Sequence, residues 1–111
     1  MSFALALLIA CAAAPQDTVP AELEVAPVLR VMSFNLRFKG GDKAPHDWAN
    51  RLPLAVEQIE LEHPDLIGTQ EGLRSQLVDL ERELEGYRWV GQGREGGSHG
   101  EYMAILYKTE R

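Results

Sequence analysis

Cysteine is almost absent from this sequence: Cys11 is the only one among 111 residues. A single cysteine excludes an internal disulfide and any zinc site built from several cysteines within the chain. A basic face is also missing, because the formal net charge is -6 and acidic residues occur throughout. This balance argues against a strong nucleic-acid patch, which relies on clustered Lys and Arg. It does not exclude an anionic small molecule, since a divalent cation held by carboxylates supplies positive charge locally.

The sequence also lacks an apolar run long enough to cross a membrane as a helix. The run over residues 3–10 has instead the length of the apolar region of a secretory signal. It leads into Leu8-Ile9-Ala10-Cys11, which resembles the bacterial lipobox, whose cysteine is lipidated and becomes the mature N-terminus. We therefore predict an exported protein, either a periplasmic or cell-envelope lipoprotein anchored through Cys11 or a secreted one. Because Met1-Ser2 carries no Lys or Arg, ordinary cleavage within residues 10–14 stays open, as does an apolar helix ending in a buried cysteine.

Composition divides the chain into three segments. Residues 1–14 form the signal-like segment, and residues 15–27 are rich in Ala, Pro and acidic residues without periodicity. The second segment is typical of a flexible tether. Residues 28–111 carry the periodic patterns and are the predicted folded part.

The folded part alternates strand and helix patterns. Strands are predicted over residues 28–36, 65–71, 87–90 and 102–107. One helix is predicted to begin at Asn50 as its N-cap and to end at His63-Pro64; a second carries leucines 73, 77, 80 and 84 and ends near Gly86. A glycine-rich loop over residues 91–100 is expected to be a flexible rim that presents Arg94 to a substrate. The order strand, helix, strand, helix, strand, strand predicts an α/β fold.

Two polar residues stand where the first two strands end. Asn35 closes the first strand and Glu71 the second. Ligands of open α/β sheets collect outside the carboxyl ends of the strands, so adjacent parallel strands would bring this amide and this carboxylate together. A few hard oxygen ligands, with positions left for water and phosphate, suit Mg²⁺.

Four stretches, residues 30–37, 48–51, 64–71 and 100–107, resemble in order the motifs of the endonuclease/exonuclease/phosphatase superfamily. The resemblance implies the fold of pancreatic deoxyribonuclease, a four-layer α/β-β/α sandwich of two facing sheets flanked by helices, of which this chain is expected to be an incomplete, N-terminal part. It also implies a Mg²⁺-dependent phosphoesterase, with Mn²⁺ as an alternative ion. Glu71 is then the metal-binding carboxylate, Asn35 a metal and catalytic residue, and Glu101 the carboxylate that orients a catalytic histidine. The implied substrate is a phosphate monoester or diester of nucleic acid, phospholipid, sugar or inositol phosphate.

The family's central histidine, its Asp-x-Asn motif and its terminal Asp-His pair do not occur before Arg111. We therefore expect the chain by itself to be inactive, and a non-catalytic tethered module or the remnant of a truncated gene is the alternative. Each candidate residue also has a structural interpretation that the sequence leaves open. Asn35 can form a turn, Glu71 can favour a helix N-terminus, and Glu101 can be a solvated residue at the start of a strand.

Overall fold

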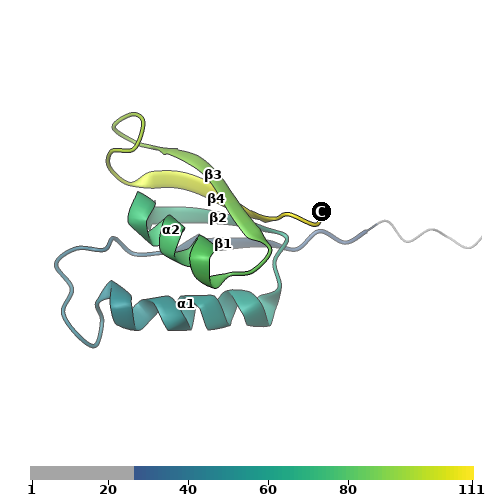
Figure 1. Ribbon diagram of the computed structural model, residues 1–111, viewed down its shortest axis with the longest axis horizontal. Helices are drawn as coiled ribbons and strands as arrows, with labels where there is room; N and C mark the ends of the chain where they lie inside the picture. Colours follow the sequence, from purple (N-terminus) through teal and green to yellow (C-terminus); the bar gives the residue numbers. More distant parts are fainter. Residues whose placement is uncertain (1–26) are drawn as a thin grey trace, which may run out of the picture.

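The computed structural model describes residues 27–111, which form one four-stranded sheet and two helices (Figure 1). In chain order the elements are β1 (Val31–Asn35), α1 (Trp48–Glu62), β2 (Leu66–Gly72), α2 (Arg74–Glu83), β3 (Tyr87–Gly93) and β4 (Tyr102–Lys108). The predicted α/β order is confirmed. Cys11, the signal-like segment and all but the last residue of the tether lie outside the described residues. Neither of the two described helices has the length and apolar character that a membrane span requires.

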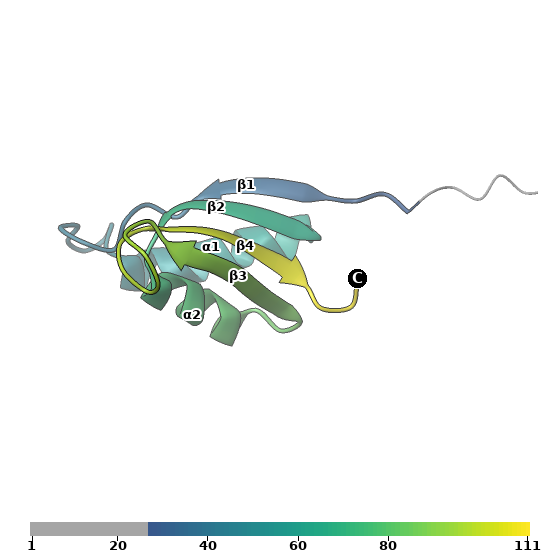
Figure 2. The same cartoon turned by 90° about the horizontal axis from the view of Figure 1, so that it is seen from above.

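The sheet has the strand order β1-β2-β4-β3, which is visible in Figure 2. β1 and β2 run parallel and are connected through α1, whereas β4 is antiparallel to both of its neighbours. The register pairs Asn35, the last residue of β1, with Gln70 near the end of β2. The carboxyl ends of the two parallel strands therefore meet at one edge of the sheet.

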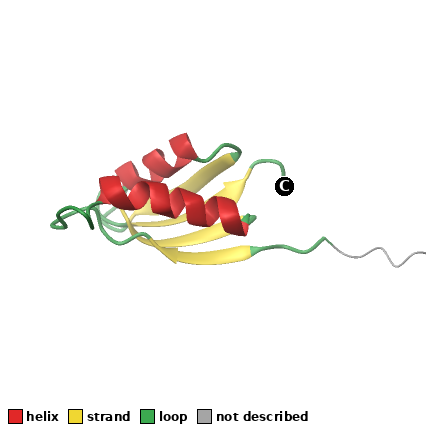
Figure 3. Ribbon diagram, turned by 90° about the horizontal axis from the view of Figure 1, so that it is seen from below, coloured by secondary structure: helices red, strands yellow, loops and turns green. Residues whose placement is uncertain are grey.

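Both helices cover the same face of the sheet (Figure 3). α1 contributes Ile59 and α2 contributes Leu77 and Leu80, all without solvent exposure, to a core completed by Ile67 and Leu106 of the sheet. Leucines 77, 80 and 84 of the pattern predicted for the second helix are thus confirmed as core. This packing buries helix-facing side chains of β2, β3 and β4 and partly buries Met32 and Phe34 of β1.

The opposite face of the sheet is open and largely apolar. Its exposed side chains include Val31 of β1, Val90 of β3, and Met103 and Ile105 of β4. Met103 has 83% of its surface exposed. One sheet covered by one layer of helices corresponds to one half of the predicted four-layer sandwich. The open face of this sheet is the face on which the sandwich would place its second sheet.

Three details differ from the sequence-based expectation. α1 begins at Trp48 and is capped by Asp47, whose side chain accepts a hydrogen bond from the backbone N–H of Asn50; Asn50 is therefore helical and not the cap. β3 continues to Gly93, because its pairing with β4 extends to Tyr102.

The third difference concerns the glycine-rich loop, which is closed by hydrogen bonds rather than open. Arg94 N–H donates to the carbonyl of Glu101, and Gly93 N–H donates to that of Gly97. The Tyr102 hydroxyl also donates to the Gly97 carbonyl, at 3.2 Å. The glycines serve tight backbone turns, with positive φ at Gly96, Gly97 and Gly100.

Candidate metal and phosphate site

Asn35 and Glu71 come together at the carboxyl edge of β1 and β2, as the sequence predicted. The Asn35 side-chain nitrogen Nδ2 donates a hydrogen bond of 2.7 Å to Glu71 Oε1. Both residues are exposed. In the described part of the chain, the second carboxylate oxygen, Oε2, makes no hydrogen bond and no ion pair.

The backbone of Glu71 has an uncommon conformation, with φ at +58°. Such left-handed geometry costs energy in a residue with a side chain, and it persists where the surroundings hold it. Here the pairing of β2 with β4 shifts register between Thr69 and Gly72, which is a β-bulge around Glu71. Bulges re-aim side chains, and this one turns the carboxylate toward Asn35.

The Asn35 amide is itself fixed at both ends. Its oxygen Oδ1 accepts a hydrogen bond of 2.8 Å from the backbone N–H of Arg37, and its nitrogen binds Glu71. The nitrogen therefore faces the carboxylate while the oxygen faces the backbone. In this arrangement Asn35 orients the carboxylate, and its predicted role as a metal ligand through oxygen stays a prediction.

Arg37 adds a cation beside the pair. Its Nε and Nη2 atoms each lie 2.8 Å from an oxygen of Asp42, which is a two-point ion pair, and about 65% of its side chain remains exposed. The hydrogen bond from Arg37 holds the pKa of Asp42 below its ordinary value, and the pKa of Arg37 is raised by Asp42 and to a smaller extent by the charge of Glu71. The backbone N–H of Arg37 also donates to Asn35, which places Arg37 next to the Asn35–Glu71 pair.

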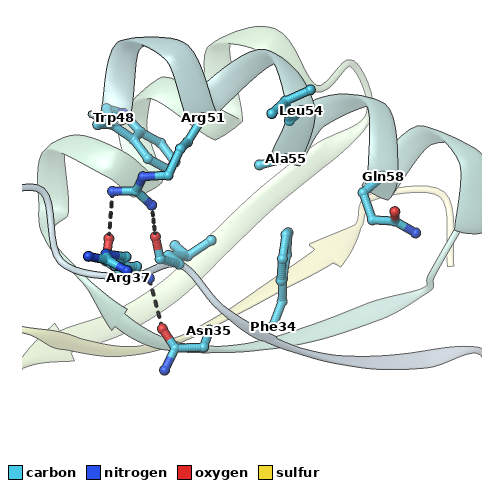
Figure 4. Close-up of a pocket in the computed structure, with 9 residues that line it drawn as sticks. Phe34, Asn35, Arg37, Trp48, Arg51, Leu54, Ala55 and Gln58 are labelled. Carbon is cyan, nitrogen blue, oxygen red and sulfur yellow. Dashed lines mark hydrogen bonds between the residues drawn. The ribbon is translucent and has the colours of Figure 1, made fainter. Parts of the chain in front are cut away.

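The segment that carries Asn35 and Arg37 is held from α1 by Arg51. The guanidinium of Arg51 donates to the carbonyls of Leu36 at 2.6 Å and of Arg37 at 3.2 Å (Figure 4). It also lies 5.4 Å from the centre of the Trp48 ring, which is buried in the core. Arg37 has φ at +51°, so these bonds hold a second backbone position of unfavourable geometry.

A groove of about 390 Å³ lies between β1 and α1. Figure 4 shows Phe34 pointing toward α1, whereas Asn35 points away from the helix. Consecutive residues of a strand face opposite sides, so the Asn35 amide lies on the open face of the sheet and the groove on its helix face.

Glu101 lies at the same edge, immediately before β4. The register pairs Tyr102 with Gly72 of β2 and with Gly93 of β3. Glu101 therefore stands one residue before this paired row, at the end of the sheet where β2 finishes. Its carboxylate lies 3.4 Å from Arg94 Nη1, and 67% of the Arg94 side chain remains exposed, so the predicted contact of Arg94 with a substrate stays a prediction. No histidine of the described residues contacts Glu101, and its predicted role stays a prediction.

The described residues contain no group of three or more His, Cys, Asp or Glu side chains arranged to hold a metal ion. Mg²⁺ nevertheless uses only one or two protein carboxylates and completes its shell with water and substrate oxygens. Glu71 is an exposed carboxylate that Asn35 orients through one of its oxygens. It therefore fits the part of one such metal ligand.

At the opposite end of the sheet, where β1 and β2 begin, the charged side chains are paired with one another. Asp65 is buried there and accepts a hydrogen bond of 2.8 Å from the backbone N–H of Arg30, with Arg111 at 3.4 Å and Lys108 at 3.9 Å. Its pKa is lowered mainly by the Arg30 hydrogen bond, with contributions from both cations. A carboxylate with this many partners joins strands and leaves little room for a ligand.

Sequence reasoning missed Arg37, Arg51 and Gln76 as parts of the site. Arg37 and Arg51 stand inside the stretches that carried the family resemblance, so their place in those stretches was the available signal. Gln76 stands in the leucine helix, where its polar side chain suggests a surface position, yet its side chain is fully buried. Only its neighbours in space reveal what it does.

Comparison with known proteins gives solved structures alone: no protein-family model matches the chain, and no curated protein does. An endonuclease/exonuclease/phosphatase family protein from Bacteroides thetaiotaomicron is 36% identical with a TM-score of 0.71, and the match covers 75% of this chain and 30% of that one. A mannosyl-6-phosphatase of the same organism is 36% identical with a TM-score of 0.71, covering 76% and 33%. An endonuclease/exonuclease/phosphatase from Bacteroides vulgatus is 30% identical with a TM-score of 0.71, covering 75% and 32%.

A functionally unknown protein from Enterococcus faecalis, 24% identical with a TM-score of 0.67 over 75% of this chain and 32% of that one, shares the fold. The chain spans about a third of the length of these structures, from 30% to 33% in the four cases.

Proposed function

Because this chain belongs to the endonuclease/exonuclease/phosphatase family and carries part of its domain, we propose that it supplies the metal-binding edge of a phosphoesterase site. The observation that carries this proposal is the Asn35–Glu71 hydrogen bond of 2.7 Å at the carboxyl edge of two parallel strands. A neutral amide orients the carboxylate without cancelling its charge. That is what a site for a hard cation needs.

Glu71 would hold Mg²⁺, or Mn²⁺, through the oxygen that Asn35 leaves free. When bound, such an ion acts as a Lewis acid on a phosphoryl oxygen and stabilises the leaving oxygen. Arg37, exposed beside the pair, would donate to a non-bridging phosphate oxygen while Asp42 keeps its guanidinium in place. Glu101 would accept a hydrogen bond from a histidine supplied by the remainder of the domain and hold its ring in orientation.

The reaction we propose is hydrolysis of a phosphate ester by in-line attack of water. Sugar phosphate monoesters are the first substrates to test, because one similar structure is a mannosyl-6-phosphatase. The net charge of -6 makes a long nucleic-acid duplex a less suitable partner. Phosphodiesters remain the second class, since the same metal chemistry serves both.

A chimera tests this function directly. Residues 28–111 of this chain would replace the matching third of the B. thetaiotaomicron mannosyl-6-phosphatase, and hydrolysis of mannose 6-phosphate and of a nitrophenyl phosphodiester would be measured. We expect turnover that a chelator abolishes and that Mg²⁺ or Mn²⁺ restores, and no turnover by the 111-residue chain alone. A folded chimera without activity on either substrate at any metal concentration would contradict the proposal.

A further inference from the structure

Gln76 is a polar side chain in an apolar position. It is the third residue of α2 and has 0% exposure, like Leu77 and Leu80 of the same helix. Burying an amide costs free energy unless hydrogen bonds replace those to water. The partners of this amide therefore explain why the core accepts it.

The Gln76 amide makes three hydrogen bonds to backbone groups of two separate segments. Its oxygen Oε1 accepts from Leu73 N–H at 3.0 Å and from Lys39 N–H at 3.1 Å. Its nitrogen Nε2 donates to the Arg37 carbonyl at 3.0 Å. No buried side-chain polar atom of the described residues is left without a partner.

These two segments are the ones that carry the candidate site. Arg37 follows Asn35 by two residues, and Leu73 follows Glu71 by two residues. One planar amide, fixed on a helix within the core, thus ties both segments to the same point. Arg37 and Glu71 both have positive φ, so these are also the segments whose backbone geometry needs to be held.

We propose that Gln76 is a positioning residue that sets the Asn35–Glu71 hydrogen bond and, through it, the direction of the Glu71 carboxylate. The part of this inference that concerns metal binding rests on the proposed function. Capping of α2 alone does not explain the contacts, because a cap requires only the bond to Leu73. The bonds to Lys39 and Arg37 reach across 37 and 39 residues of sequence.

The test compares three variants of the full 111-residue chain with the wild type at pH 8. Gln76→Met removes all three hydrogen bonds at similar side-chain volume, and Gln76→Glu keeps the acceptor but removes the donor to Arg37. Leu80→Ala is the matched control, because it opens a cavity at a buried position of the same helix and destabilises the protein while it keeps all three hydrogen bonds of Gln76.

Two measurements are made on each variant: NMR shifts and hydrogen exchange of the Asn35 side-chain amide without metal, and Mn²⁺ affinity by paramagnetic titration. We expect Gln76→Met to free the Asn35 amide and to weaken Mn²⁺ binding about 10- to 100-fold, with Gln76→Glu intermediate. Leu80→Ala should lower the melting temperature and leave the Asn35 amide and the Mn²⁺ affinity of the folded protein unchanged.

The two proposals fail differently. An unchanged Asn35 amide in folded Gln76→Met, or an equal loss in Leu80→Ala, would overturn the positioning role. If the wild type binds no Mn²⁺ while Gln76→Met still frees the Asn35 amide, the positioning role stands and the metal function falls.

Discussion

Asn35 and Glu71 are 36 residues apart in the chain, and the amide nitrogen of the first lies 2.7 Å from a carboxylate oxygen of the second. An arginine in place of Asn35 would fix the carboxylate equally well but would neutralise it. The amide fixes one oxygen and leaves the negative charge available to a cation. This relationship makes Glu71 the residue whose replacement tests the site most directly.

Glu71→Gln removes the charge and keeps the shape. In the active chimera we expect turnover to fall by orders of magnitude and the Mg²⁺ concentration needed for activity to rise, with little change in metal-free stability. If Glu71 only favours the N-terminus of α2, the same change should cost about 0.3–1 kcal/mol and leave turnover nearly intact. A Mg²⁺ titration of activity beside metal-free melts separates the two roles.

Asn35→Ala removes the donor to Glu71 and the acceptor for Arg37 N–H. We expect a loss of turnover in the chimera together with about 1 kcal/mol of stability from the lost turn hydrogen bond. Ser33→Ala on the same strand face serves as the control. Asn35→Ala with wild-type kinetics would reduce Asn35 to a turn former.

Asp65 should make stability depend on pH. Its folded pKa lies below its unfolded value of roughly 3.9. The stabilisation is therefore fully present above that unfolded value and is lost as the pH falls through the lower folded value. Unfolding free energy measured from pH 7 down to pH 2 should show this loss, and Asp65→Asn should be less stable at pH 7 and show a shallower acid slope. Equal acid slopes for the two proteins would remove Asp65 as the cause.

The open face should bind an apolar dye when the 111-residue chain is expressed alone. Met103 and Ile105 are exposed there side by side with Val90 of the neighbouring strand. We expect anilinonaphthalene sulfonate fluorescence to rise with the wild type and to fall in Met103→Lys/Ile105→Thr. Leu61→Lys, a change at an isolated exposed leucine of α1, should leave it unchanged; the reverse pattern would place the dye on the helix layer.

Lipidation of Cys11 remains a prediction. Expressed in a bacterium with its own N-terminus, the chain should fractionate with membranes and incorporate labelled fatty acid, and Cys11→Ser should abolish the label. An unlabelled, soluble periplasmic wild type would support export and contradict the lipid anchor.

The sequence predicted the element order and the meeting of Asn35 with Glu71, because hydrophobic period and strand-end polarity are local signals. The start of α1 was wrong by three residues, since Asp47 and Asn50 are both good N-caps. In the structure Asp47 is the cap, and the buried Trp48 is the first residue of the helix.

The backbone conformation of Glu71 and the contacts of Gln76 could not be predicted from the sequence, for a different reason. The positive φ of Glu71 results from the register of β2 against β4, strands separated by a helix and another strand. Likewise, the burial of Gln76 depends on the loop after β1 folding over α2. Such features arise from long-range pairing, which periodicity does not encode.

The left-handed backbone at Glu71 has a consequence for engineering. Glycine would relieve that geometry at no steric cost, so a search for thermostable variants would favour exchanging this residue. The same exchange would delete the carboxylate. With the proposed metal role of Glu71, position 71 would be a point of stability–activity trade-off, and libraries built to raise the melting temperature of this fold should keep it fixed.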